Sequence, residues 1–156
     1  GKIVEEFSTL VDPETYFSNF NIQLTGITPE AVEGAPTFEE LWPRLEPVFS
    51  SGVLTAHNAP FDMSVLAKCL RAYCVEWRDT MPYLCTCQMG RRCYPALPNH
   101  KLDTLCGHVG IQLNHHQADS DSHACALLLL DYLEHGMDAE PFLRTYDLIN
   151  IRTVQP

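Results

Sequence analysis

A short apolar run that leads directly into an acidic helix start is the feature that most restricts how this chain can fold. Residues 53–56 suit a buried strand, and residues 57–62 read His-Asn-Ala-Pro-Phe-Asp. A proline in a first helical turn, with Asp62 close behind it, indicates that a helix begins here. Because strand ends and helix starts often build binding sites, we expect Asp62 at a functional corner.

A second acidic motif comes later in the chain. Residues 116–121 read His-Gln-Ala-Asp-Ser-Asp and open an apolar helical pattern, so His116 and Asp121 are five positions apart. Two carboxylates and a histidine are the parts needed to hold hard metal ions and to deprotonate water. Asp119 is a further acidic candidate, which we expect to be the N-cap of the helix.

Strand and helix patterns are mixed along the chain, which predicts one α/β domain over residues 1–156. Strands are expected at residues 2–11, 53–57 and 81–86. Helices are expected at residues 38–49, 59–73, 88–94, 101–109, 120–135 and 139–149. Thr37 and Glu40 form a capping-box pattern before the first helix, and Pro43 and Pro47 predict that this helix is kinked or broken.

Three further segments extend the two motifs into an ordered series: residues 2–11, the Leu-Thr-Gly-Ile-Thr of residues 24–28, and the Asn-His-Lys-Leu-Asp-Thr-Leu-Cys of residues 99–106. In this order and at these separations, the chain resembles the DnaQ-like (DEDDh) 3′–5′ exonucleases. This family includes the epsilon proofreading subunit of bacterial DNA polymerase III. The resemblance implies a ribonuclease H-like fold, with a mixed sheet flanked by helices.

The chain departs from the family at its start. The family opens with a strand that carries Asp-x-Glu, and neither this pattern nor Glu-x-Glu occurs before Gly26. Glu5 and Glu6 are adjacent, so on a strand they would face opposite sides. We therefore expect an N-terminally incomplete domain that lacks the family's first two strands, which lie centrally between the strands at 2–11 and 53–57. The isolated chain is expected to be weakly active or inactive.

The resemblance also implies roles for individual residues. Asp62 and Asp121 would hold two divalent cations, Mg²⁺ or Mn²⁺, although two carboxylates supply little charge for a second cation. His116 would be the general base, since the family spacing to Asp121 fits it and not His115. The residues that would shape the pocket for the terminal nucleotide are Leu24, Thr25, Gly26 and Ile27. Without the resemblance, Asp62 suits an ordinary first helical turn and residues 24–27 an ordinary turn.

Composition restricts the kinds of partner, the state of the cysteines and the compartment to be expected. The formal net charge of −10 argues against a simple electrostatic DNA binder, but not against a nuclease that carries cationic metals. Seven cysteines, an odd number without Cys-x-x-Cys, favour reduced thiols over disulfides or a zinc site. No apolar run is long enough to cross a bilayer, so we expect a cytoplasmic protein without a membrane partner.

These patterns favour a two-metal 3′–5′ exonuclease of the proofreading or repair type. Its partners would be single-stranded or frayed DNA 3′ ends, and a DNA polymerase subunit. RNA-end trimming is an alternative that uses the same site. A different alternative is a non-catalytic module that binds nucleic acid or protein and derives from the same fold.

Overall fold

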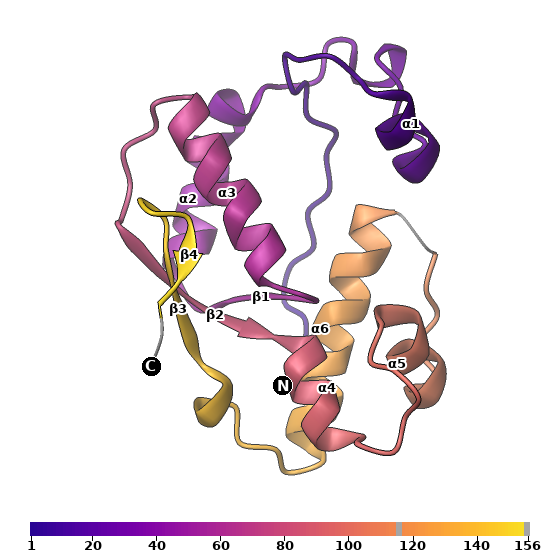
Figure 1. The fold of residues 1–156 in the computed structure, drawn as a ribbon. Coiled ribbons are helices and arrows are strands. Elements are labelled where there is room, and N and C mark those ends of the chain that lie inside the picture. Colours follow the sequence, from indigo (N-terminus) through magenta and orange to yellow (C-terminus); the bar gives the residue numbers. More distant parts are fainter. Residues whose placement is uncertain (115–116, 155–156) are drawn as a thin grey trace.

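A mixed sheet of four short strands organises the molecule, in the order β1-β2-β3-β4 (Figure 1). The computed structural model describes residues 1–114 and 117–154. β1 (Leu54–Ala56) is parallel to β2 (Thr80–Cys85), whereas β2 with β3 (Arg144–Asp147) and β3 with β4 (Arg152–Thr153) are antiparallel. β1 pairs with β2 on one side, and none of the described residues pairs with its other edge. The predicted α/β class and mixed sheet are confirmed.

Six α-helices surround the sheet in the described part of the chain. They are α1 (Asn19–Thr25), α2 (Phe38–Ser50), α3 (Pro60–Ala72), α4 (Thr86–Cys93), α5 (Leu102–Val109) and α6 (Ala118–Glu134), and the two 3₁₀ turns are η1 (Glu30–Val32) and η2 (Glu140–Phe142). The capping box of Thr37 and Glu40 is confirmed at the start of α2. α2 nevertheless runs unbroken through Pro43 and Pro47, both of which are exposed.

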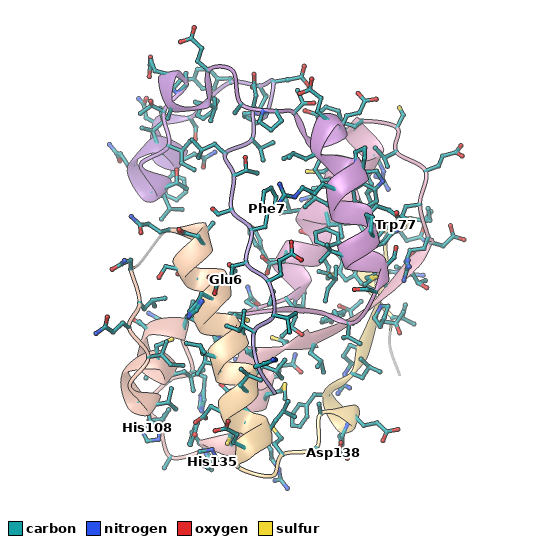
Figure 2. The ribbon with its side chains drawn as sticks, turned by 180° about the vertical axis from the view of Figure 1, so that it is seen from behind. Glu6, Phe7, Trp77, His108, His135 and Asp138 are labelled. Carbon is teal, nitrogen blue, oxygen red and sulfur yellow. The ribbon has the colours of Figure 1, made fainter. Side chains whose placement is uncertain are left out.

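The predicted strand at residues 2–11 is wrong. A strand needs a ladder partner, and the first backbone bond from this segment to a distant residue is that of Asp12 N to the Pro36 carbonyl, 2.9 Å. Instead, residues 1–11 run extended across the face that Figure 2 presents, and Glu6 contacts His123 of α6. The side chain of Phe7 packs under the Arg44 guanidinium of α2, 3.5 Å from the ring centre.

The predicted helix at residues 139–149 is also wrong, because the 3₁₀ turn η2 and the strand β3 occupy the centre of this range. Tyr146 pairs with Met81 of β2 and is buried, with its ring packed edge-on against Tyr83. Residue 147 then pairs with Thr80. These cross-strand contacts with a distant segment outweigh the helical periodicity of the sequence.

Two hydrophobic cores hold the layers together. One lies between α3 and the sheet, and the other joins α4, α5 and α6. On α3, Met63, Ala67 and Leu70 face the core and are buried, whereas Phe61 and Val65 are 64% and 41% exposed. None of the described helices is long and apolar enough to span a membrane.

Tyr132, in the second core, buries a hydroxyl group that is expected to lower the stability of the fold. It is fully buried, yet its hydroxyl has no hydrogen-bond partner among the described residues. A buried hydroxyl without a partner costs about 1–3 kcal/mol, so Tyr132→Phe is expected to raise the free energy of unfolding by about 1 kcal/mol in urea denaturation. Tyr83→Phe is the matched control, because the Tyr83 hydroxyl lies 3.0 Å from Thr153 Oγ1 and its loss should destabilise. Equal losses in both variants would contradict this assignment.

Candidate active site

The two predicted metal-binding carboxylates line one hollow. Asp62 lies in the first turn of α3 and Asp121 in the first turn of α6, and both border a hollow of about 470 Å³ at the carboxyl end of β1. Its apolar wall is formed by Phe49, Leu54, Met63, Leu66 and Leu102. Anionic side chains suit first helical turns, where the helix dipole is positive. The fold thus brings together two residues that are far apart in sequence.

Asp121 presents an oxygen that no described group satisfies. Its Oδ1 is buried and has no hydrogen-bond partner among the described residues. A buried carboxylate oxygen without a partner is costly unless a cation or a donor binds it. This orphaned oxygen, at a hollow that Asp62 also lines, therefore suits a hard divalent cation.

The hollow is electrostatically negative. Partial desolvation raises the pKa of Asp62, although the residue as a whole is exposed, and a hydrogen bond from its own backbone opposes the shift. Burial raises the pKa of the Cys125 thiol, on the wall of the hollow, to about 11, and the Asp62 charge adds to this shift. Burial likewise raises the pKa of Cys106 to about 11, with a contribution from Asp121. Such a field favours a cation and keeps the thiols protonated.

His57 holds the turn between β1 and α3 in place through hydrogen bonds to residues that are distant in sequence. Its Nε2 lies 3.1 Å from the His100 carbonyl, and its Nδ1 lies 3.0 Å from Thr86 Oγ1. Since a carbonyl only accepts, Nε2–H donates to it, and the Thr86 hydroxyl donates to Nδ1. The Cys125 thiol, 3.4 Å from Thr86 Oγ1, can then donate to that oxygen. This chain of bonds connects β1, α4, α6 and the segment before α5.

Other predicted site residues are placed differently. His116 lies outside the described residues, and its role as general base stays a prediction. Leu24 and Thr25 end α1, and residues 24–27 are not among those that line the hollow. Gly26 is the C-cap of α1 with φ 71°, a left-handed conformation that explains this glycine by helix termination alone. The N-cap of α6 is Gln117, so the prediction of Asp119 as N-cap is wrong.

Two residues of the site escaped the sequence analysis. Thr86 is fully buried and polar. The only feature of the sequence that could have indicated it is a hydroxyl-bearing residue at the end of an apolar strand. Cys125 follows Asp121 by one helical turn, so the two share a face of α6. Among the described residues, no group of three or more His, Cys, Asp or Glu side chains gathers as a metal-binding cluster.

A mixed four-stranded sheet with flanking helices has the architecture of ribonuclease H-like exonucleases. The chain belongs to the exonuclease family described as "RNase_T: Exonuclease", whose model matches residues 1–129. Exonucleases of this type use divalent metal ions.

Individual relatives agree with this membership. The chain is 33% identical over 151 residues to a PolC-type DNA polymerase III of Bacillus subtilis (96% of this chain, 10% of the relative), and 38% identical over 132 residues to that of Clostridium perfringens (83% and 9%). The chain thus spans about a tenth of the length of these relatives. It also resembles the solved structure of Exonuclease X in complex with 5′ overhanging duplex DNA (TM-score 0.68, 27% identity, 96% of this chain and 82% of that one). A 3′-exonuclease that recognises the histone mRNA stem-loop shares the fold (TM-score 0.75, 19% identity, 99% and 74%).

Proposed function

We propose that this chain is a single exonuclease-like domain that hydrolyses the terminal phosphodiester at the 3′ end of DNA. The observation that carries the proposal is the hollow lined by both Asp62 and Asp121, the latter with an orphaned Oδ1. Proofreading or repair of single-stranded or frayed ends, beside a DNA polymerase, is the role that the PolC-type relatives suggest.

The residues would divide the chemistry between them. Asp62 and Asp121 would hold Mg²⁺ or Mn²⁺, which when bound neutralise phosphate charge and lower the pKa of water. His116 would take the proton of the attacking water, since an imidazole pKa near 6.5 suits that task at neutral pH. Residues 24–27 would receive the terminal nucleotide.

Two carboxylates supply little negative charge for two adjacent dications. We propose that the Asp-x-Glu pair implied by the family resemblance would come from a strand that pairs with the open edge of β1, next to the hollow. An unpaired strand edge offers a row of free backbone groups to such a strand. Without it, weak activity is expected.

A 5′-labelled single-stranded oligonucleotide, in DNA and RNA forms, incubated with Mn²⁺ or Mg²⁺ tests this function. We expect a slow ladder of products shortened from the 3′ end, which disappears in His116→Ala and in Asp121→Asn. An identical ladder in both variants would exclude this site as its source. Nucleic acid that is bound but never shortened would instead favour the alternative, a non-catalytic binding module. This alternative is supported by the absence of a cluster of three or more His, Cys, Asp or Glu side chains among the described residues.

A further inference from the structure

The two most exposed aromatic side chains of the described residues lie close together in sequence, far along the chain from the carboxylate pair. Tyr16 is 83% exposed and Phe20 is 70% exposed. Phe20 belongs to α1, which buries none of its residues. Single exposed apolar residues are ordinary on protein surfaces, but Tyr16 lines a hollow, and an exposed aromatic side chain at a hollow indicates an interaction surface.

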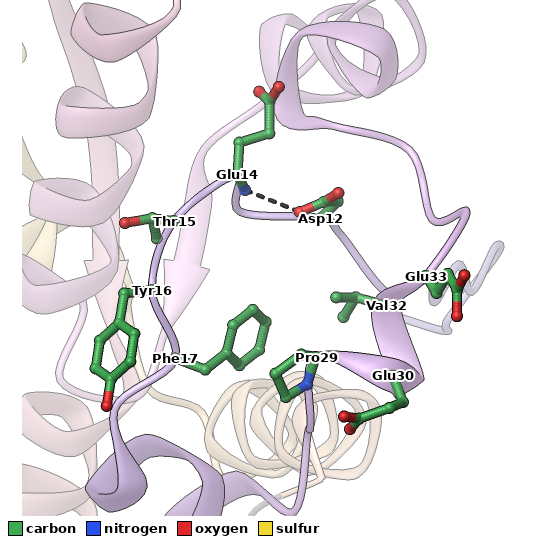
Figure 3. Close-up of a pocket in the computed structure, with 9 residues that line it drawn as sticks. All are labelled: Asp12, Glu14, Thr15, Tyr16, Phe17, Pro29, Glu30, Val32 and Glu33. Carbon is green, nitrogen blue, oxygen red and sulfur yellow. Dashed lines mark hydrogen bonds between the residues drawn. The ribbon is translucent and has the colours of Figure 1, made fainter.

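Tyr16 lines a hollow of about 800 Å³. Figure 3 shows its middle, where the side chains of Phe17 and Val32 point toward each other and the Pro29 ring lies beside them. Val32 is buried, whereas Phe17 is half-buried. These three side chains form an apolar floor that an inserted side chain could cover.

Carboxylates surround this floor. The residues that line the hollow include four of them, Asp12, Glu14, Glu30 and Glu33, and no Lys, Arg or His. A hydrogen bond with the backbone of Glu30 itself, and then one with Thr28, lowers the pKa of Glu30 and keeps it ionised. Asp12 Oδ1 accepts from the backbone N–H of Glu14, 2.9 Å away, and the hydrogen bond between the Glu14 and Tyr73 side chains raises the pKa of Tyr73 to about 12.

The arrangement of charge and apolar surface selects the ligand. The Glu14, Glu30 and Glu33 side chains spread away from the floor in Figure 3 instead of converging, which is unsuited to a metal ion. Exposed aromatic rings could stack on bases, but a nucleic-acid strand would bring phosphates against four carboxylates. A polypeptide segment with both cationic and apolar side chains satisfies the rim and the floor together.

We propose that this acidic hollow (Asp12, Glu14, Phe17, Glu30, Val32 and Glu33), together with Tyr16 at its rim, docks a short basic segment of a partner protein. An apolar side chain of the partner lies on Phe17 and Val32, and its Lys or Arg side chains face Glu30 and Glu33. The inference goes beyond the proposed function, because it uses none of the residues that line the carboxylate hollow.

Fluorescence anisotropy with the whole chain tests the proposal. The probe is a labelled peptide of about eight residues in which Lys and Leu alternate around a central Phe, and the comparison probe replaces every Lys with Glu. We expect the basic probe alone to bind. Tyr16→Ser, and separately the double change Glu30→Gln with Glu33→Gln, should each weaken binding at least about tenfold, equivalent to ~1.4 kcal/mol.

Matched controls make the result specific. Leu143→Ser and Glu134→Gln change an exposed apolar and an exposed acidic residue outside the hollow, and should leave binding unchanged. Circular dichroism should show the same melting temperature for Tyr16→Ser and for the unsubstituted chain. Absence of binding, equal binding of the acidic probe, or equal binding by all variants would overturn the proposal. An oligothymidylate that binds the unsubstituted chain but not Tyr16→Ser would overturn it in favour of a nucleic-acid surface.

Discussion

We expect Mn²⁺ to stabilise the fold through the proposed site, and Asp121→Asn to remove this stabilisation without weakening the metal-free fold. A cation present at about 100 times its dissociation constant adds about 2.7 kcal/mol to the free energy of unfolding. If the variant binds at least about 100-fold more weakly, this increment falls to about 0.4 kcal/mol. Thermal denaturation with and without Mn²⁺ measures both quantities directly.

The metal-free half of this prediction rests on the environment of one oxygen. Asp121 Oδ1 is buried and lacks a partner among the described residues, and the Asp62 carboxylate borders the same hollow. An uncharged amide at position 121 relieves the unpaired buried charge. The melting temperature without metal should therefore stay constant or rise. Such a compromise between stability and ligand binding is typical of functional sites.

Asp119→Asn is the control for the change in charge. Asp119 lies in the same helical turn but is exposed, and its Oδ1 accepts the N–H of Ser120 at 2.9 Å. The Mn²⁺ increment should survive in this variant. Equal losses of the Mn²⁺ increment in the two variants would mean that it reflects the net charge of the helix start and not a specific site. No change in the melting temperature of the unsubstituted chain on adding Mn²⁺ would show that the two aspartates hold no cation.

Local signals in the sequence were sufficient for most helices. The capping box at Thr37 and the glycine at position 110, which has φ 79°, mark helix ends through interactions within a few residues. Residues 2–11 and 139–149 were misjudged because strand formation depends on a partner elsewhere in the chain, which periodicity cannot reveal.

The two carboxylates could be predicted from the sequence, whereas the residues that hold their surroundings in place could not. Asp62 and Asp121 were predicted together through the order of the motifs, and the structure places them at one hollow. Thr86 and His100, which bind His57, lie 29 and 43 residues away from it, and no local pattern connects them. The residues that hold a site in place are therefore harder to predict than the residues that form it.

His57→Ala is expected to lower the free energy of unfolding by about 3 kcal/mol at pH 7.5. The change removes the imidazole from the His100 carbonyl and the buried Thr86 hydroxyl, which keep only longer contacts of 3.3–3.5 Å with other groups. The two lost hydrogen bonds account for about 1–3 kcal/mol together, and the cavity left by the half-buried ring adds to this loss. Urea denaturation measures the loss. His108→Ala, which removes an exposed imidazole, should cost less than about 1 kcal/mol.

The cost of His57→Ala should shrink in acid, which distinguishes this network from simple packing. Burial lowers the pKa of His57, against the opposing effect of the His100 carbonyl, so the folded state favours the neutral ring. The stabilisation is complete above the unfolded pKa of about 6.5 and is lost as the pH falls through the lowered pKa of the folded state. A double-mutant cycle with Thr86→Val should show a coupling of about 1 kcal/mol at pH 7.5. Additive losses that are independent of pH would mean that His57 only fills space, and the corner that presents Asp62 would then depend on packing alone.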